Sequence, residues 1–468
     1  MVRWIDSRLG TAKLARTALG KVFPDHWSFL IGEIALYAFI VLVLTGTYLT
    51  FFFDASSQDT VYRGSYAALR GLHMSQAYRS AVDLSFDVRA GLVMRQVHHW
   101  AALLFIAAIV VHLMRVFFTG AFRKPRELNW MVGVTLLILA IFNGFAGYSL
   151  LDDQLSGTGL RIAYSITLSI PLAGTWLASL LFGGKFPGPD IIERLFVIHI
   201  LLVPALIVAL LVAHLAILVR QKHAQFRGPG RSETNVVGER VWPSFAFKSL
   251  GMMMLTTAMV CLLGGVAQIN PIWLYGPFRP AEVSSASQPD WYMGWLDGAL
   301  RLYPGWELRA FGFEVPAPFF PAVLLAGVTF AALYLWPFLE ARVTGDRASH
   351  HLLDRPRDRP VRTALGVATL SFYAVCTLAA SSDVTATTFN LSVNVVLWSF
   401  RVLLVVAPVV TGWVAHSLCK ELARRDADEP AEPAVSDEAA PEPGGDRALD
   451  AAGGVGPDEG RELTTVGD

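Results

Sequence analysis

Eight apolar runs, each long enough to cross a lipid bilayer, constrain this chain of 468 residues more than any other feature. Crossing the hydrocarbon core takes about 20 residues of α-helix, and backbone polar groups in lipid must pair within their own segment, which favours helices. Charged residues make up only 16% of the chain, whereas soluble domains carry about 25%. We therefore predict an all-α integral membrane protein with spans near Phe29–Phe53, Gln96–Thr119, Trp130–Leu150, Ile191–Arg220, Phe245–Gln268, Phe319–Glu340, Arg362–Ala380 and Val393–Leu418.

Basic residues in the connecting segments predict which way the spans run. Lys and Arg favour the cytoplasmic side of short loops. They cluster in Arg123–Arg126 and Arg355–Arg362, which fall on the same side as the N-terminus when the spans alternate. We therefore expect both termini on the cytoplasmic side of a cell membrane. We expect no cleaved signal peptide, because the first apolar run is long enough to span.

The chain divides into four predicted regions. They are a cytoplasmic N-terminus, a bundle of the first four spans, a region with the last four spans, and an acidic tail, at residues 1–28, 29–225, 226–420 and 421–468. From Asp426 to Asp468 the tail holds thirteen acidic residues and few apolar ones. Such a composition cannot offset the entropy of ordering, so we expect the tail to be disordered.

Two outer connections are long enough to carry function. Leu151–Gly184 joins the third and fourth spans, and Asn270–Pro318, residues 270–318, joins the fifth and sixth. Long loops in compact proteins are often functional. We expect a surface helix near Gly159–Ser169 in the first of them.

Four histidines inside the second and fourth spans are the strongest chemical signal. His98 and His112 are 14 residues apart, and His199 and His214 are 15 apart. An α-helix turns about 100° and rises about 1.5 Å per residue. His98 and His112 are therefore about 40° out of phase around the helix and about 21 Å apart along its axis. His199 and His214 are about 60° out of phase and about 22 Å apart. Each span thus carries one histidine near each membrane face.

Two neighbouring residues bear on this spacing. His99 is about 140° away from His112 around the helix, so His98 is the better candidate ligand. Pro204 lies between His199 and His214 and can kink the helix, which would absorb the extra residue.

The second and fourth spans cross in the same direction, so their histidines meet at two levels. We call His98 and His199 the outer pair, and His112 and His214 the inner pair. Ionisable groups inside spans usually face the bundle interior and serve function. Two imidazoles at each level fit two b-type haems, whose iron then has no open position and carries electrons. A polar pocket or a proton path explains a single histidine equally well, but not two matched pairs.

Glycines and arginines near the histidines support this interpretation. Each of the first and third spans has two glycines 14 residues apart, at Gly32, Gly46, Gly133 and Gly147. A flat porphyrin needs helix positions without a side chain, although small residues also simply permit close helix packing. Arg95 and Arg115 each lie three residues from a candidate ligand, where they could pair with haem propionates. The alternative is that they are ordinary basic residues at helix ends.

Two other classes of protein fit the sequence less well. A membrane-anchor cytochrome of a dehydrogenase has four or five spans rather than eight. A proton-coupled transporter would need a polar site near the membrane midplane, often at broken helices, whereas the histidines here lie near the two faces.

Several motifs resemble the cytochrome b family of the respiratory cytochrome bc complexes. Pro289-Asp290-Trp291-Tyr292 resembles the PEWY motif of that family, and Gly147–Leu150 resembles its GYxLP stretch. The run Asp152–Arg161, together with Gln221–His223 and Gly228–Arg231, is similar to the actinobacterial branch. The resemblance covers about residues 20–420, in order.

This resemblance implies a quinol–cytochrome c oxidoreductase subunit. Non-covalent b haems would be held by the outer and inner pairs, with quinol oxidised near the outer face and quinone reduced near the inner face. Two protons would leave outward per quinol, so the reaction contributes to proton translocation. The quinol, menaquinol by analogy with actinobacteria, would meet Gly159, Pro289 and Trp291, with Asp290 and Tyr292 as catalytic residues.

The resemblance also implies partners. They would be a Rieske-type iron–sulfur subunit, a cytochrome c subunit, cytochrome c oxidase in a supercomplex, and a second copy of the complex in a homodimer. No nucleic acid is expected.

The sequence departs from the family in two places: Asp290 stands where the family has a glutamate, and Leu151 stands where it usually has a proline. The chloroplast-type relatives attach an extra haem through a cysteine near the start of the first span, but no cysteine precedes Cys261 here, so we expect no covalently attached haem. Quinol oxidation releases protons, and Asp290 is the candidate base. The alternative is an aspartate that caps a helix beginning near Trp291.

A cationic inner pocket is predicted from Arg220, Lys222 and His223. They follow the inner ligand His214, and cations with a histidine suit quinone reduction, which builds negative charge and takes up protons. The alternative is that they are basic residues flanking a span on its cytoplasmic side.

Overall fold

The computed structural model describes residues 2–10, 12, 16, 19–186, 188–282, 288–310 and 312–428. The predicted acidic tail lies outside these residues from position 429 onward. Within the described part, eight helical segments are long and apolar enough to cross a membrane, which confirms the eight predicted spans. They are Trp27–Thr50, Gly91–Phe118, Glu127–Ser149, Ile191–Gln221, Val241–Val266, Phe319–Thr344, Pro360–Ala379 and Val393–Asp428.

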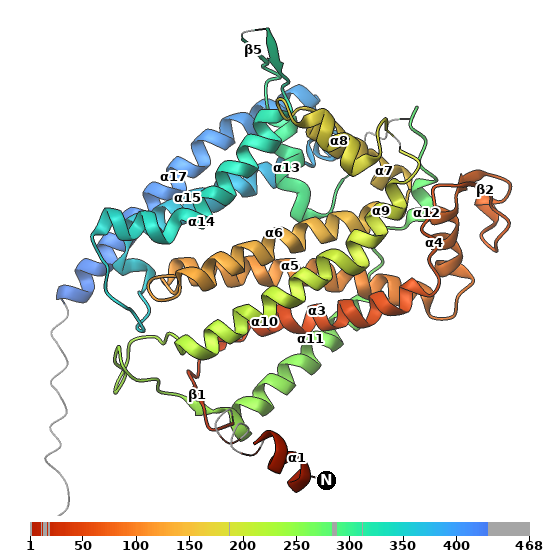
Figure 1. The fold of residues 1–468 in the computed structure, drawn as a ribbon. Coiled ribbons are helices and arrows are strands. Elements are labelled where there is room, and N and C mark those ends of the chain that lie inside the picture. The colour runs from red at the N-terminus through yellow and green to blue at the C-terminus, as the bar shows by residue number, and fades with distance from the viewer. Residues whose placement is uncertain are drawn as a thin grey trace, which may run out of the picture. The chain divides into compact units, whose positions relative to one another are not determined.

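The first four spans form a bundle (Figure 1). They are α3 (Ile31–Thr50), α5 (Gly91–Phe118), α6 (Glu127–Ser149) and a fourth span made of α9 (Ile191–Val197), η3 (Ile198–Leu202) and α10 (Val203–Gln221). Helix α5 packs against α3 and α6, and α6 packs against α10. We call the end where α5 and α9 begin the outer end, and the end where α5 and α10 finish the inner end.

The middle of the bundle is filled by apolar side chains. This buried cluster includes Phe39 of α3, Ile106 of α5 and Ile207 of α10, which expose 7%, 1% and 2% of their surface. Phe105 and Leu137 belong to it as well. The bundle therefore has a dry layer halfway along its length.

The last four spans lie beside this bundle. Helix α11 (Ala246–Val266), which follows η4 (Val241–Phe245), packs against α5 and α3. Helix α14 (Leu325–Thr344), which follows η5 (Phe319–Leu324), packs against α6. Figure 1 shows α14 grouped with α15 (Pro360–Ala379) and α17 (Val393–Asp428).

The outer end is built from the connecting segments. It carries strands β2 (Asp59–Val61) and β3 (His73–Ser75), which pair antiparallel, and β5 (Leu308–Ala310) and β6 (Phe313–Val315), which do the same. Its helices are η2 (Ala67–Leu69), α4 (Gln76–Phe86), α7 (Gln154–Leu168), α8 (Gly174–Phe182), α12 (Ile272–Tyr275), α13 (Trp291–Leu302) and α16 (Ser382–Thr388). A buried cluster that includes Tyr62, Tyr78 and Ile272 holds part of it together, and Leu151 packs against that cluster. Leu151 therefore serves as packing at the position where the family usually has proline.

The surface helix expected near Gly159–Ser169 begins earlier, as α7 at Gln154. Asp153 is its N-cap: one carboxylate oxygen accepts hydrogen bonds from the backbone N–H groups of Leu155 (3.1 Å) and Ser156 (3.4 Å). The Ser156 hydroxyl accepts in return from the Asp153 N–H at 3.1 Å. This capping box satisfies the N–H groups that a helix start leaves unpaired, so the first helical turn forms before the expected start.

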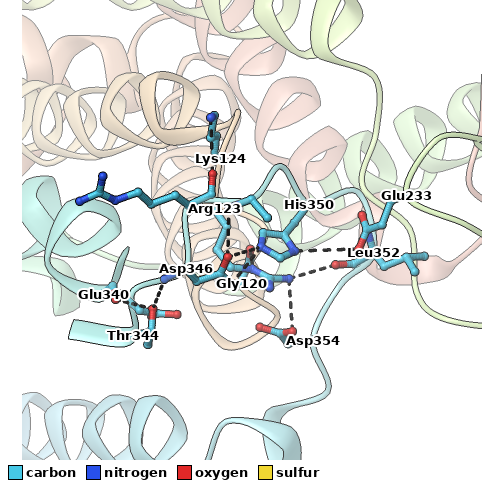
Figure 2. Close-up of polar contacts among 12 residues, drawn as sticks. Gly120, Arg123, Lys124, Glu233, Glu340, Thr344, Asp346, His350, Leu352 and Asp354 are labelled. Carbon is cyan, nitrogen blue, oxygen red and sulfur yellow. Dashed lines mark hydrogen bonds and ion pairs between the residues drawn. The ribbon is translucent and has the colours of Figure 1, made fainter. Parts of the chain in front are cut away.

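The inner end is held by charged groups (Figure 2). Strands β1 (Val22–Phe23) and β4 (Glu239–Arg240) pair there, and α1 (Val2–Leu9), η1 (Trp27–Phe29) and η6 (Pro356–Asp358) complete the described elements. The Asp354 carboxylate forms ion pairs with three arginines, and its side chain is only 3% exposed. The nitrogen–oxygen distances are 3.2 Å to Arg123, 3.0 Å to Arg362 and 3.3 Å to Arg359. The basic segments that predicted orientation therefore also tie the inner loops together.

Candidate functional site

The two rings of the outer pair of histidines lie close together inside the bundle. The ring centres of His98, on α5, and His199, in η3, are 6.2 Å apart, and the ring planes are inclined by 75°. His98 Nδ1 lies 2.9 Å from Thr45 Oγ1, and His199 Nδ1 lies 2.9 Å from the backbone oxygen of Asn143. A histidine whose Nδ1 is engaged in this way keeps Nε2 for a metal.

This separation fits a metal ion between the two rings. Metal–imidazole bonds are about 2.0–2.1 Å long, and a five-membered ring with bonds of about 1.35 Å has its centre about 1.15 Å from each atom. A metal in line between two such rings sets their centres about 6.3 Å apart, close to the 6.2 Å observed. The outer pair is therefore suited to a haem iron with two axial imidazoles, which carries electrons.

The inner pair lines a cavity of about 330 Å³. His112 and His214 share its wall with Arg115 and Arg126. Arg115 Nε and Nη2, Arg126 Nε and His112 Nδ1 are all buried without a hydrogen-bond partner. Buried polar atoms are nearly always paired in a protein, and carboxylates such as haem propionates would pair with these guanidinium groups. The donor set therefore fits a haem at the inner level too.

Each of the four predicted glycines lies beside one of the four histidines. A Cβ atom at Gly46 would lie 3.1 Å from His98 Cε1, and one at Gly32 would lie 3.2 Å from His112 Cε1. At Gly133 it would lie 3.6 Å from His214 Cε1, and at Gly147 it would overlap the ring of His199. The glycines were expected to leave room for a porphyrin ring, but their most direct contact is with the histidine rings.

A π-helical turn accommodates the 15-residue spacing in the fourth span. It covers Ile198–Leu202, contains His199 and ends two residues before Pro204. A π-helix closes each hydrogen-bonded turn over one more residue than an α-helix does. The extra residue between His199 and His214 is thus taken up beside the outer ligand, and Pro204 falls in the first turn of α10.

Arg95 and Arg115 lie at the two ends of α5. Arg95 donates to the backbone oxygen of Asn270 at 3.1 Å, while its Nε and Nη2 are buried without a partner. The Arg115 guanidinium lies 4.2 Å from the centre of the Phe29 ring. Both arginines therefore have donors left for an anionic group at their own haem level.

Asp290 is held between α5 and α13. Its Oδ1 lies 2.9 Å from His99 Nε2, and its Oδ2 accepts a hydrogen bond from the Tyr292 hydroxyl at 3.0 Å. Asp290 occupies the N-cap position of α13, but its side chain makes no capping hydrogen bond. The capping alternative is therefore wrong for the side chain: its two oxygens face His99 and Tyr292 because α13 packs against α5 at this point.

The neighbours of Asp290 form a mostly buried wall. Tyr292 is 3% exposed, and burial, followed by the charge of Asp290, raises its pKa well above the ordinary value. A Cβ atom at Gly159 would overlap the hydroxyl of Tyr148. Trp291 is 42% exposed and Pro289 is half-buried, so two residues of the predicted quinol site remain accessible from outside the bundle.

Of the three predicted inner-site residues, only His223 lies at the inner cavity. Its Nε2 is buried without a partner, and burial, followed by the charges of Arg115 and Arg126, lowers its pKa to about 4. Arg220 and Lys222 are exposed and do not line the cavity. The chain leaves α10 at Gln221 and turns at Lys222, whose φ is +63°, which separates the two cations from the cavity.

Sequence reasoning missed several residues at these sites. One is Arg126, which was used only to predict membrane orientation. It donates hydrogen bonds to the backbone oxygens of His350 and Lys222. Glu33, one residue after Gly32, lines the inner cavity. A charged residue in an apolar run, next to a glycine already singled out, was the signal that could have found it.

The chain is similar to known proteins over most of its length. The family description "Cytochrome b(N-terminal)/b6/petB" matches residues 103–277. The chain is 54% identical to the cytochrome bc1 complex cytochrome b subunit of Mycobacterium leprae, over 90% of this chain and 77% of the relative. It is 49% identical to the subunit of the same name from Streptomyces coelicolor, over 91% and 78%. A solved structure titled "Hyperthermophilic respiratory Complex III" shares the fold, with a TM-score of 0.65 and 19% identity over 89% of this chain and all of that one.

Proposed function

This chain belongs to the cytochrome b subunits of the cytochrome bc1 complex, and from that premise we propose how its residues divide the work of a quinol–cytochrome c oxidoreductase. Membership makes the protein a multi-pass membrane subunit that binds haem b and acts in electron transport. We propose the number of haems, the roles of individual residues and the larger assemblies that the complex forms.

Two b haems are held non-covalently, one by the outer pair and one by the inner pair of histidines. The observation that carries this assignment is the geometry of the two levels: the outer rings have the separation of an axial bis-imidazole complex. The inner rings share a cavity with unpaired arginine donors. Arg95 and Arg115 orient the propionates by charge-assisted hydrogen bonds. The haems supply one-electron carriers between the two faces of the membrane.

Quinol, menaquinol by analogy with the actinobacterial relatives, is oxidised near the outer end. Its site lies between Gly159 and the Pro289–Tyr292 motif, and Asp290 accepts a proton from the quinol hydroxyl. The contacts of Asp290 with His99 and Tyr292 support this role because they hold the carboxylate in place. The carboxylate makes no capping hydrogen bond to α13, so its oxygens remain near the motif.

Quinone is reduced at the inner cavity, where His223 supplies a polar contact. Its unpaired Nε2 and the apolar lining suit a ring that carries carbonyl oxygens. Arg220 and Lys222 are exposed and do not line this cavity, so we assign the inner site to His223 alone of the three predicted residues.

Membership of the family supports two partner subunits, a Rieske-type iron–sulfur subunit and a cytochrome c subunit. We extend this proposal to a homodimer of complexes that joins cytochrome c oxidase in a supercomplex. It resides in the cell membrane with both termini cytoplasmic, as the basic segments around Arg123 and Arg359 favour.

One measurement on the purified complex tests this proposal. A reduced-minus-oxidised spectrum should show b-type haem, and the haem-to-protein ratio should be two per copy of this chain. A ratio of one would refute the two-level assignment, and the level that survives would be identified by substituting one histidine of each pair.

A further inference from the structure

A carboxylic acid faces the inner cavity from the first turn of α3. Glu33 lines the cavity one residue after Gly32, which lies against the ring of His112. Its Oε2 accepts a hydrogen bond from Ser249 Oγ of α11 at 2.8 Å and a longer one from the Tyr37 hydroxyl at 3.4 Å. Tyr37 and Ser249 also hydrogen-bond to each other. The two hydroxyls thus hold one oxygen of the carboxyl group.

Glu33 has no cation beside it among the residues that the structure describes, because no Lys, Arg or His lies within ion-pair distance of its carboxylate. Lys248, next to Ser249 in sequence, instead contacts Asp25 at 2.8 Å and Glu239 at 2.9 Å near the surface. An ionised carboxylate in an apolar surrounding without a partner is costly. Glu33 therefore differs from the other acids of the inner end, Asp354 and Asp346, which are paired with arginine or histidine.

The cavity around Glu33 is mostly apolar, and its other charged groups come from different elements. Phe23, Leu36, Leu218 and Phe245 supply apolar lining. Arg115 of α5 and Arg126, just before α6, face the cavity with unpaired nitrogen atoms, and His223 follows α10. A quinone has two carbonyl oxygens, and each needs one proton on reduction. Glu33 on α3 and His223 after α10 lie on separate parts of the cavity wall, so each can meet a different carbonyl oxygen of a quinone.

We propose that Glu33 is a catalytic residue that gives one proton to the quinone reduced in the inner cavity. The inference rests on the proposed inner quinone site. The quinone gains two electrons, which come from quinol oxidised at the outer end, and two protons. The O–H bond of the Glu33 carboxyl breaks as an O–H bond forms at one quinone oxygen. The carboxylate then takes a proton back from water at the inner face, where α11 begins and Lys248 is exposed.

The main competing explanation is structural: Glu33, Tyr37 and Ser249 could serve only to join α3 to α11. Glu33→Gln separates the two roles because glutamine has the same shape and can still accept from Ser249 and Tyr37, but cannot release a proton. We expect the haem-to-protein ratio to stay at the wild-type value. We expect reoxidation of the inner haem by added quinone to slow by at least ~10-fold, since a positioned acid typically contributes about 10²–10⁴-fold.

Two further variants complete the experiment. Glu127→Gln makes the same change at the inner end in a residue that does not line this cavity, so reoxidation should keep the wild-type rate. Ser249→Ala removes the shorter hydrogen bond and keeps the acid, so it should slow reoxidation less than Glu33→Gln does. Wild-type reoxidation in Glu33→Gln would overturn the proposal, and so would an equal slowing in Ser249→Ala.

An infrared measurement on the unaltered protein gives an independent readout. The difference spectrum recorded on quinone reduction should contain a carboxyl C=O band that shifts when glutamate is isotopically labelled and is absent from Glu33→Gln. Absence of a glutamate band in the wild type would overturn the proposal even if the variant failed to assemble. If the wild-type inner haem were not reoxidised by quinone at all, the proposed inner site itself would fail, which is a distinct outcome.

Discussion

Neutralising Asp290 should slow quinol oxidation without disturbing the haem sites. Asp290→Asn keeps the size of the side chain, and its amide oxygen can still accept from Tyr292, which now lies 3.0 Å from the carboxylate. The amide nitrogen can donate to His99, now 2.9 Å away. The substitution therefore removes the proton acceptor and leaves the local packing in place.

The size of the effect follows from the role of a general base. Such a group typically contributes about 10²–10⁴-fold to a rate. A water molecule held near the same position can replace part of that contribution, so we expect a loss of at least ~10-fold, which corresponds to about 1.4 kcal/mol in the activation barrier. The side chain is only 17% exposed, so bulk solvent has limited access to it.

The assay is the rate of haem reduction after quinol is mixed with the oxidised complex. Asp290→Glu should retain much of that rate because it keeps a carboxylate. Asp297→Asn is the matched control: it makes the same change on the same helix, where the carboxylate is paired with Arg301 at 2.9 Å rather than placed beside the quinol motif. It should keep a rate of haem reduction near the wild-type value. Full turnover in Asp290→Asn with normal haem content would assign the proton to another group.

Three further predictions concern the ligands, one buried acid and the tail. Alanine at either histidine of the outer or the inner pair should remove one haem and spare the other, whereas His99→Ala should keep both haems; haem-to-protein ratios decide this, and a haem lost from His99→Ala alone would contradict the ligand assignment. Burial raises the pKa of Asp152 to about 6. Because this carboxyl group ionises at a lower pH in the unfolded chain, the folded protein loses stability as pH rises from about 4 through about 6. Asp152→Asn, which suits the φ of +51° there, should therefore raise the free energy of unfolding by up to about 3 kcal/mol at pH 7.5 and not at pH 4; thermal unfolding at the two pH values measures this, and an equal effect at both would refute it. Deleting residues 426–468 should leave haem content and quinol oxidation intact, and loss of assembly would reveal a partner contact in the tail.

Much of this fold could be predicted because its main signals are local in sequence. Long apolar runs specify spans wherever they occur, and the spacing of His98 and His112 needs only the geometry of one helix. The 15-residue spacing of His199 and His214 indicated that the fourth span departs from a regular α-helix by one residue. It did not indicate what kind of departure this is. A π-turn instead of a proline kink depends on packing around η3, which no local pattern contains.

The missed features depend on contacts between distant segments. Asp290 meets His99 across 191 positions, and Glu33 meets Ser249 across 216. Hydrophobic periodicity does not report such pairs. Arg220 and Lys222 were assigned to the inner site by their nearness in sequence to His214. Because the chain turns at Lys222, only His223 follows the cavity wall.

The two proposed proton sites differ in a way that suits opposite reactions. At the outer end Asp290 is held by His99 and Tyr292, which orient a carboxylate that receives a proton. At the inner end Glu33 has hydroxyl partners and no cation within ion-pair distance among the described residues, which suits a carboxyl group that gives one. Between them lies the apolar layer around Phe39, Ile106 and Ile207. Apart from Tyr292, the buried members of this layer are apolar, and haems at the two levels would carry electrons through it. Quinol chemistry at the two ends can then remain coupled to proton translocation, because electrons cross the bundle while protons must enter and leave at opposite faces.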